Sequence, residues 1–588
     1  MLLELLPKTE GLVVAVGLPH LHQRALFNCV AVIANKKLIG LVPKQNLAGD
    51  GIHYEPRWFK PWQNGIITRT HIGDHEIPIG DLLFAVGDIR FGFEICEDAW
   101  VAGRPGHRMA ECGVDIILNP SASHFAFGKH EIRKRFVLEG SRSFGVSYVY
   151  ANLIGNEAGR AIYDGGALIA SGGDMIAAGP RFRFEETDVV AADVDVDLTR
   201  ARRAGIHSMA AHVNEDIFDR MIPIPGKFVP VDSPLESPLE LLTESKVDEF
   251  TQVIALALFD YLRKSRSWGF VVSMSGGADS SACAVLIRSM VERGLKDLGL
   301  NDFQRRLSYI PGLSDATGAG EVMKLLFSGV YQSTRNSSEI TRHAAEQVTL
   351  AVGGTFFEIS VDEIVQLYTS AIEGAIGRTL TWQQDDIALQ NIQARTRSPS
   401  VWLLTNIRNA LLLSTSNRSE AAVGYATMDG DTSGGLSPIA GIDKAFLREW
   451  LKMFETKGSS GVHSVDALSF VNVQQPTAEL RPSEYEQTDE RDLMPYPLLD
   501  HIECLAIRDK LSPAEILETL IREHTGYTAE QLSEWVRRFF TLWSRNQWKR
   551  ERYAPSFHVD DKNLDPKTWC RFPILSGGFQ FELNHLPK

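Results

Sequence analysis

Short apolar runs alternate with amphipathic stretches along most of the chain, and this alternation predicts an α/β protein. In the first part of the chain, apolar runs at 12–16, 29–33, 38–42, 88–95, 115–119 and 146–152 predict strands. The turn residues Asn35 and Lys36 separate two of these runs, so 29–33 and 38–42 are expected to form a hairpin. Strands of this kind, separated by helical stretches, indicate a layered α/β sandwich.

The second part of the chain repeats strand and helix more regularly. Strands are predicted at 270–274, 306–310, 355–360 and 410–414, and helices at 239–262, 281–290, 321–327, 337–352 and 390–405. Because helix follows strand repeatedly, we expect a parallel, doubly wound sheet with ligands at the carboxyl ends of its strands. Pro399 is expected to kink or end the helix that contains it.

A proline-rich segment separates these two parts. Between 221 and 238 the sequence holds five prolines, at 223, 225, 230, 234 and 238. Proline lacks a backbone donor and favours extended chain, so this segment is predicted to be a connector. The predicted domains are therefore 1–227 and 228–588.

The loop Ser275-Gly-Gly-Ala-Asp-Ser280 joins the predicted strand at 270–274 to the helix that follows. Its two glycines allow close approach of the backbone to a ligand, and a helix N-terminus points N–H groups at an anion. The lysine of the GxxxxGK[ST] loop is absent. The loop resembles the SGGxDS loop of the ATP pyrophosphatase (PP-loop) superfamily, which splits ATP between its α and β phosphates. The alternative is a tight strand-to-helix turn.

Composition narrows the class of protein. The net charge of −14 argues against general binding of nucleic acid or anionic membranes. Six cysteines in 588 residues form no disulfide framework or CxxC zinc pattern, and no apolar run reaches membrane-spanning length. The first residues lack the pattern of a signal peptide. We therefore expect a cytoplasmic protein.

Cys96 and Lys44 both stand just past predicted strands, where side chains can be held rigidly. A lysine ammonium lowers the pKa of a nearby thiol and stabilises an oxyanion. With Glu55, Asn119-Pro-Ser-Ala-Ser-His124 and Tyr163-Asp-Gly-Gly166, these residues resemble the glutaminase domain of the nitrilase superfamily. The resemblance implies that Cys96 attacks an amide, that Lys44 stabilises the oxyanion and that Glu55 supports them. The alternatives are a buried small cysteine and a surface carboxylate.

The glutamate that serves as base in this superfamily is expected well upstream of the lysine. Glu4 and Glu10 are the only upstream glutamates, and neither has the expected sequence context. This pattern predicts that the sandwich lacks its first strands, through a late start or a lost base. It also predicts slow glutamine hydrolysis, an expectation that normal glutaminase turnover would contradict.

Further motifs follow the PP-loop in a fixed order. They are Thr415-Ser-Asn-Arg-Ser-Glu420, Gly424-Tyr-Ala-Thr427 with Asp429-Gly-Asp431, Pro476-Thr-Ala-Glu-Leu480 and Gln487-Thr-Asp-Glu490. Together with the cysteine–lysine domain, they resemble the glutamine-dependent NAD synthetase family over nearly the whole chain. The fold class implied is a nitrilase-like α-β-β-α sandwich followed by a doubly wound PP-loop domain.

The resemblance also implies a reaction: a nicotinate dinucleotide carboxylate attacks the α phosphate of ATP, and ammonia from glutamine then displaces AMP to give NAD. Mg²⁺ is the implied metal, with Asp279 and Glu420 as its carboxylates; for Glu420, the alternative is a carboxylate at a helix N-terminus. The residues implied to bind ATP are Ser275, Gly276, Gly277, Asp279, Ser280 and Thr415. Those implied to bind the dinucleotide are Arg395, Glu420, Asp431 and Lys549.

Three rival functions stay open from the sequence. One is another glutamine-dependent PP-loop ligase such as GMP synthetase, which would be distinguished by its product. A second is an ammonia-dependent NAD synthetase with an impaired glutaminase domain. The third is a nucleotide-binding regulator that never releases pyrophosphate. The expected partners are small-molecule substrates, without nucleic acid or membrane, and the family resemblance implies a homo-oligomer.

Overall fold

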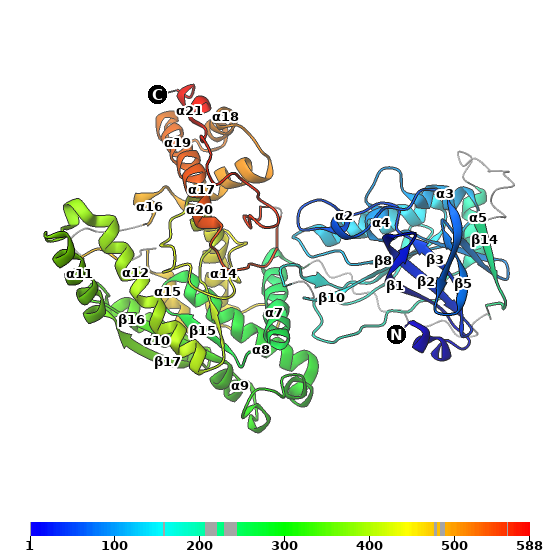
Figure 1. Ribbon diagram of the computed structural model, residues 1–588, viewed down its shortest axis with the longest axis horizontal. Coiled ribbons are helices and arrows are strands. Elements are labelled where there is room, and N and C mark those ends of the chain that lie inside the picture. Colours follow the sequence, from blue (N-terminus) through cyan, green and yellow to red (C-terminus); the bar gives the residue numbers. More distant parts are fainter. Residues whose placement is uncertain are drawn as a thin grey trace. The chain divides into compact units, whose positions relative to one another are not determined.

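The chain divides into two compact units in a computed structural model (Figure 1). The structure describes residues 2–156, 159–205, 220–228, 244–475, 479–482, 489–560 and 562–587. The first unit comprises 1–155 with 163–243, and the second comprises 156–162 with 244–588. The prediction that the whole proline-rich segment is a connector is wrong at its start, because Pro223 lies in strand β14 (Met221–Ile224), which pairs with a neighbouring strand. Pro230, Pro234 and Pro238 lie outside the described residues, and the predicted boundary at 227 stays a prediction.

The first unit contains two large sheets. The five-stranded sheet has the order β1 (Val13–His22), β2 (Ala25–Ala34), β3 (Lys37–Pro43), β5 (His75–Gly80) and β4 (Ile67–Ile72). The seven-stranded sheet has the order β13 (Asp174–Ala178), β12 (Leu168–Ser171), β9 (Ser147–Asn152), β8 (Ile116–Ser121), β7 (Ile89–Phe93), β6 (Leu83–Val86) and β14 (Met221–Ile224). A small sheet pairs β10 (Ile154–Gly155) with β11 (Tyr163–Asp164). The predicted hairpin is confirmed as β2 and β3.

Alternation along β2 explains how the two sheets pack. Its even-numbered residues, such as Val30 and Val32, join a buried cluster with Phe84 and Phe93 of the seven-stranded sheet. Its odd-numbered residues, such as Ala31, face the opposite side of the five-stranded sheet and pack with other apolar groups. Helices α3 (Pro105–Glu111) and α4 (Lys129–Phe144) pack on the seven-stranded sheet through a third cluster. The predicted layered α/β sandwich is confirmed.

The second unit is built on a parallel sheet in the order β17 (Thr355–Ser360), β16 (Phe327–Ser333), β15 (Phe270–Ser273) and β18 (Leu411–Leu413). Strands β16 and β17 lie on one side of β15, and β18 lies on the other. The loops after β15 and β18 therefore diverge at the carboxyl edge and leave a crevice between them. The predicted doubly wound sheet is confirmed.

Helices surround this sheet and continue to the C-terminus (Figure 1). They are α7 (Lys246–Ser265), α8 (Ala278–Arg306), α9 (Ala319–Leu326), α10 (Glu339–Ala351), α11 (Asp362–Ile376), α12 (Trp382–Ile407), α13 (Arg418–Val423), α14 (Lys444–Thr456), α15 (Ser469–Asn472), α16 (Asp489–Asp492), α17 (Tyr496–Glu503), α18 (Pro513–Glu523), α19 (Ala529–Arg545), α20 (Gln547–Arg550) and α21 (Gln580–Asn584). The first unit adds α1 (Leu2–Leu5), α2 (Glu55–Trp58) and α5 (Val196–Ala204). Helices α17 to α19 bury an apolar cluster around α13, which fixes α13 beside the sheet.

Two predictions about the second unit are wrong. The segment 306–310 is not a strand: α8 runs to Arg306, and the buried Leu307 and Ile310 pack from the turn that follows. The second strand is β16, whose glycine and serines hide its apolar character. The expectation that Pro399 ends its helix is also wrong, because α12 continues through it. The residue of α12 with non-helical backbone angles is Asp385, fourteen residues before the proline. A kink at Pro399 stays a prediction.

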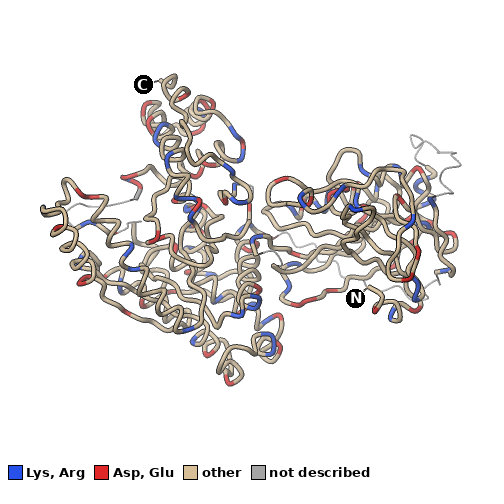
Figure 2. The backbone as a smooth tube through the Cα atoms, in the orientation of Figure 1, with Lys and Arg blue, Asp and Glu red and all other residues tan. Residues whose placement is uncertain are grey.

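Charges of both signs are interspersed along both units (Figure 2). In the described part of the chain, no helix is long and apolar enough to cross a membrane. The main buried charge cluster of the second unit surrounds Arg418, whose guanidinium lies 2.9 Å from Asp443, 2.9 Å from Asp560 and 3.2 Å from Glu503. Lys562 also lies 3.7 Å from Asp560. Burial raises the pKa of Glu503 to about 8 against the attraction of Arg418 and Lys562.

Glu503→Gln is expected to flatten the pH dependence of stability. The raised pKa means that native Glu503 holds a proton which the unfolded chain releases above pH 4.5. The free energy of unfolding of the second unit should therefore fall as pH rises from about 4.5 towards 8, by up to about 1.4 kcal/mol per pH unit. Urea unfolding of the wild type and the variant at pH 6 and pH 7.5 measures this, with Glu534→Gln on α19 as an exposed control. If the free energy of unfolding changed equally with pH in wild type and in Glu503→Gln, the raised pKa assigned to Glu503 would be wrong.

Candidate active sites

Cys96 is presented on a sharp turn directly after β7. It opens a short 3₁₀ turn, Cys96–Ala99, with a backbone φ of 49°, a left-handed conformation that costs energy for a residue with a side chain. Behind the turn, the buried carboxylate of Glu94 accepts hydrogen bonds from Gly106 N at 2.7 Å and Tyr148 Oη at 2.6 Å. It also pairs with Arg104 at 2.7 Å. The strained turn is thus anchored at the carboxyl edge of the seven-stranded sheet.

Lys44 and Glu55 form an ion pair in the same unit. Lys44 follows β3 and its side chain is 1% exposed, and its Nζ contacts Glu55 Oε2. Glu55 also accepts hydrogen bonds from Asn28 Nδ2 at 2.8 Å and from Ala48 N at 2.7 Å. Glu55 is therefore not a free surface carboxylate: it holds the ammonium of Lys44 in one place.

A second lysine, which the sequence did not single out, interacts electrostatically with Cys96. Burial lowers the pKa of Lys129 to about 7, and Cys96 is among the groups that oppose this shift. Lys129 Nζ lies 3.2 Å from His124 Nδ1, which lies 3.0 Å from His53 Nε2. The sequence signal available was the position of Lys129 at the first residue of α4, shortly after the His124 segment.

The two glutamates upstream of Lys44, Glu4 and Glu10, are both exposed. Glu4 is exposed on α1, and Glu10 is exposed and pairs with Lys36 at 2.8 Å. Among the described carboxylates, Glu55, Glu97 and Asp98 interact electrostatically with Lys44. Burial raises the pKa of Glu97, and Lys44 and Lys129 oppose that shift.

The loop after β15 forms the core of a second site. Gly276 has φ of 80°, and a Cβ there would lie 2.1 Å from Thr341 O, so only glycine fits. Gly277 caps the long helix α8. Ser280 Oγ accepts from Ser275 N at 3.2 Å, and Ser275 Oγ accepts from Gly277 N at 3.2 Å. These bonds shape the loop so that the N-terminus of α8 opens into the crevice.

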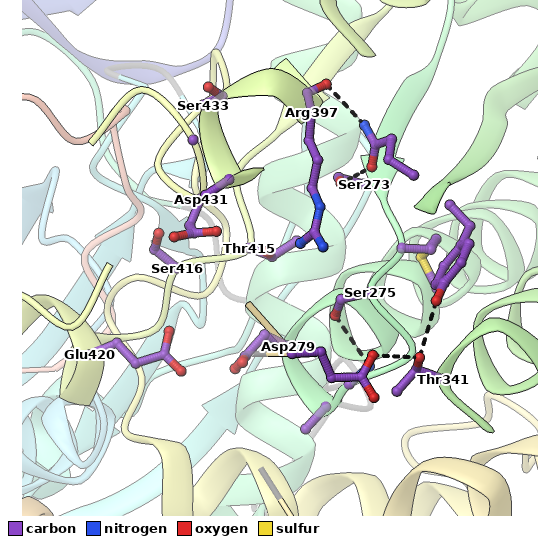
Figure 3. A pocket seen from close by; sticks show the side chains of 18 of the residues that line it. Ser273, Ser275, Asp279, Thr341, Arg397, Thr415, Ser416, Glu420, Asp431 and Ser433 are labelled. Carbon is purple, nitrogen blue, oxygen red and sulfur yellow. Dashed lines mark hydrogen bonds between the residues drawn. The ribbon is translucent and has the colours of Figure 1, made fainter. Parts of the chain in front are cut away.

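Two carboxylates from different elements face each other beside this loop (Figure 3). Asp279 lies in the first turn of α8, and Glu420 in the first turn of α13. Lys444, the first residue of α14, contacts Asp279 Oδ2 and lies 3.0 Å from Glu420 Oε1. Asn417 Nδ2 also donates to Asp279 Oδ1 at 3.0 Å. The pair is thus held together by one ammonium and one amide.

Six of the ten predicted site residues of this unit line one pocket of about 210 Å³. Of those residues, the ones that line it are Ser275, Gly277, Asp279, Thr415, Glu420 and Asp431. Gly276 and Ser280 shape the loop itself. Arg395 and Lys549 are not in the lining: Arg395 is exposed and donates to Met428 O at 3.0 Å, and Lys549 donates to Gly424 O at 2.7 Å. Lys549 nevertheless interacts electrostatically with Asp431 and Arg395.

The structure adds three basic residues that sequence reasoning missed as site residues. Arg397 on α12 reaches into the pocket, near Thr415 in Figure 3, and Lys444 and Arg448 of α14 line it as well. Arg397 had a signal, because it shares a helix face with Gln393 and Gln390. Lys444 had no comparable sequence signal, because a lysine directly after the N-cap residue Asp443 looks like any residue at the start of a helix.

The remaining family-like motifs are described only in part. Residues 476–478 and 487–488 lie outside the described residues. Glu479 accepts hydrogen bonds from Ser338 Oγ at 2.8 Å and Thr341 Oγ1 at 2.9 Å, and it lines the pocket. Glu490 accepts from Tyr496 N at 3.2 Å.

In comparisons with known proteins, each of the two units matches a family model. The NAD synthase family model matches residues 250–552, and the carbon-nitrogen hydrolase model matches residues 2–204. A glutamine-dependent NAD(+) synthetase of Saccharomyces cerevisiae is 30% identical over 97% of this chain and 85% of its own length. One from Dictyostelium discoideum is 29% identical over 95% and 82%. The crystal structure of a glutamine-dependent NAD(+) synthetase from Cytophaga hutchinsonii matches with a TM-score of 0.82 and 41% identity, covering 100% of this chain and 88% of that one.

Proposed function

The chain belongs to the glutamine-dependent NAD(+) synthetase family, and on that premise we propose how its two sites divide the reaction. The enzyme amidates nicotinic acid adenine dinucleotide to NAD, using ATP and glutamine. The comparisons do not favour the rival functions, whether an ammonia-dependent synthetase, another PP-loop ligase or a regulator. The observation that carries the proposal is the meeting of Asp279 and Glu420 beside the glycine loop.

The second unit carries the ligase chemistry in this proposal. A carboxylate oxygen of the dinucleotide forms a bond to the α phosphorus of ATP, and the bond to the pyrophosphate oxygen breaks. Ser275, Gly276, Gly277 and Ser280 shape the cradle for the departing pyrophosphate, where helix N–H groups meet negative charge. Ammonia then bonds to the acyl carbon, AMP leaves with its electron pair, and the nitrogen loses a proton.

The acidic pair fits Mg²⁺ in its donor chemistry. Mg²⁺ is usually bound by one or two carboxylates together with substrate phosphates. Asp279 and Glu420 supply two carboxylates that are close enough to share the ammonium of Lys444. In the described residues, no group of three or more His, Cys, Asp or Glu could hold a metal. Bound Mg²⁺ would neutralise charge on the phosphates.

Charged and polar side chains in and near the pocket are proposed to hold the nucleotides. We assign Arg397, Lys444 and Thr415 to ATP, because they line the pocket beside the loop. Asp431, Arg395 and Lys549 are assigned to the dinucleotide, since Lys549 interacts electrostatically with both of the others.

The first unit supplies the ammonia. Cys96 attacks the amide carbon of glutamine, Lys44 stabilises the oxyanion that forms, and Glu55 keeps Lys44 in place. Ammonia leaves, and water hydrolyses the thioester to release glutamate.

Product analysis tests the proposed ligase chemistry. The enzyme is supplied with nicotinic acid adenine dinucleotide, ATP, Mg²⁺ and ammonium, and its products are separated. The proposal requires one AMP and one pyrophosphate for each NAD. ADP with phosphate, or an amidated xanthine nucleotide in a parallel reaction, would exclude it.

We further propose that the enzyme assembles with copies of itself through α11 and α12. Helix α11 has no buried residue, and its apolar side chains are exposed, at 70% for Leu367 and 53% for Ile372. Ile387 on α12 is 72% exposed. An apolar surface of this kind typically marks an interaction site, and a symmetric copy of the same chain would cover it.

Leu367→Glu is expected to lower the oligomeric state, because it places a charge in the apolar surface. The molar mass from light scattering after gel filtration measures this. Ile521→Glu on α18, at a position that is 44% exposed, is the matched control and should leave the mass unchanged. A wild-type monomer would contradict the proposal.

A cytoplasmic location is also proposed, and the six free cysteines support it.

A further inference from the structure

Asp98 closes the turn that carries Cys96. It lies two residues after the nucleophile and is 2% exposed. Its Oδ2 accepts a hydrogen bond from Ile95 N at 3.0 Å, and its own N–H donates to Ile95 O at 3.1 Å. These two bonds clamp the residue before Cys96, at the point where the chain enters its left-handed conformation.

The other oxygen of Asp98 holds the segment that follows Lys44. Asp98 Oδ1 accepts from Asn46 N at 2.8 Å and from Asn46 Nδ2 at 3.0 Å. Asn46 stands two residues after Lys44, which also interacts electrostatically with Asp98. A single buried carboxylate is thus bonded to both chain segments that carry the reacting pair.

We propose that Asp98 is a positioning residue for amide hydrolysis, which fixes Cys96 and Lys44 relative to one another through Ile95 and Asn46. The inference rests on the proposed roles of Cys96 and Lys44. Asp98 is not assigned as a base, because its two oxygens already accept hydrogen bonds from three N–H groups. Oδ2 accepts from the backbone of Ile95, and Oδ1 accepts from the backbone and the side chain of Asn46.

The reaction needs such a connection because its two groups come from different sheets. Lys44 follows β3 of the five-stranded sheet, and Cys96 follows β7 of the seven-stranded sheet. Small sliding between packed sheets would change the distance from ammonium to thiolate. A misplacement of about 1 Å can reduce a rate about a hundredfold. Hydrogen bonds to a buried charge are strong enough to resist that sliding.

Asp98→Asn tests the proposal in the full-length enzyme. The substitution keeps the size of the side chain but places an NH₂ group opposite a backbone donor. The kcat for glutamine hydrolysis should fall at least tenfold, with KM changed less than about threefold, because positioning of the reacting groups is lost rather than glutamine binding. Ammonium-supported NAD formation should stay within about twofold of wild type. Glutamate release and NAD formation measure the two activities.

Asp115→Asn is the matched control. Asp115 is also buried in the first unit and accepts a backbone hydrogen bond, from Arg90 N at 3.0 Å. It precedes β8, however, and β8 runs parallel to β7, so it lies at the sheet edge opposite Cys96. Asp115→Asn should affect stability but not kcat for glutamine. An equal fall in kcat for both variants would show a general structural effect and overturn the proposal.

Asn46→Ala gives a readout that a purely structural role would not move. It changes no charge, whereas Asp98→Asn removes one. If Asn46 helps to hold the ammonium of Lys44 near the thiol, its loss should slow the reaction of Cys96 with iodoacetamide at neutral pH, because the thiolate is the reacting form. The alkylation rate, followed on the Cys96 peptide by mass spectrometry, is measured without turnover. An alkylation rate equal to that of wild type would overturn the proposal.

Glutamine hydrolysis by Cys96→Ala separates this inference from the proposed function. If Cys96→Ala retained glutamine hydrolysis, the proposed nucleophile itself would be wrong. If instead Cys96→Ala abolishes hydrolysis while Asp98→Asn and Asn46→Ala behave as wild type, only the positioning role fails. In the Asp98→Asn background, Asn46→Ala should cause little further change, because the bond it removes is already perturbed.

Discussion

Replacing Cys96 by alanine is expected to abolish NAD formation from glutamine and to leave NAD formation from ammonium intact. The nucleophile of a covalent mechanism has no substitute, so the glutamine-supported rate should fall at least about a thousandfold. The ammonium-supported rate depends on the pocket of the second unit and should change less than about twofold. Both rates are measured as NAD formed from nicotinic acid adenine dinucleotide and ATP.

The matched control for this prediction is Cys112→Ala in the same unit. Cys112 follows α3 and is partly buried, and burial raises the pKa of its thiol, as expected for an unreactive cysteine. Its replacement should leave both rates near wild type. Retained NAD formation from glutamine by Cys96→Ala would contradict the assignment of Cys96 as the nucleophile.

Asp279→Asn is expected to remove NAD formation with either nitrogen source. The substitution preserves shape but leaves Glu420 as the one carboxylate of the facing pair, so charge on the phosphates is less well neutralised. We expect both rates to fall about a hundredfold or more. Raising Mg²⁺ should restore part of the lost rate if the residue acts through the metal. Initial rates over a Mg²⁺ series measure both effects.

The control for Asp279→Asn is a second aspartate on the same helix, α8. Asp302 stands near the other end of α8, is partly exposed and pairs with Arg305 at 3.0 Å. Asp302→Asn should leave both rates unchanged. Alkylation of Cys96 should be normal in both variants, which shows that the first unit is folded. Full activity of Asp279→Asn would exclude the acidic pair as the metal site.

The fold could largely be predicted from the sequence because its signals are local. The hairpin of β2 and β3 follows from apolar alternation and two turn residues, and β15 follows from a short apolar run before a glycine loop. The strand β16 could not be found in this way, since its sequence mixes Gly329 and serines with apolar residues and is specified by neighbouring strands.

The site was predictable where residues sit in one loop and less so where distant segments meet. Asp279 and the glycines belong to one contiguous motif. Lys444 is separated from Asp279 by 165 residues, so only the packing of α14 against the pocket reveals that they touch. Pro399 illustrates a different limit: the intrinsic cost of proline in a helix is real, yet tertiary packing retains α12 through it.

The central claim is that the nitrogen released at Cys96 reaches the product made in the second unit. Its most direct test supplies glutamine labelled with ¹⁵N in its side-chain amide, together with nicotinic acid adenine dinucleotide, ATP and Mg²⁺, and analyses NAD by mass spectrometry. The account predicts NAD that carries the label in wild type and none from Cys96→Ala. Folded wild-type enzyme that makes NAD from added ammonium but never incorporates the label would contradict it.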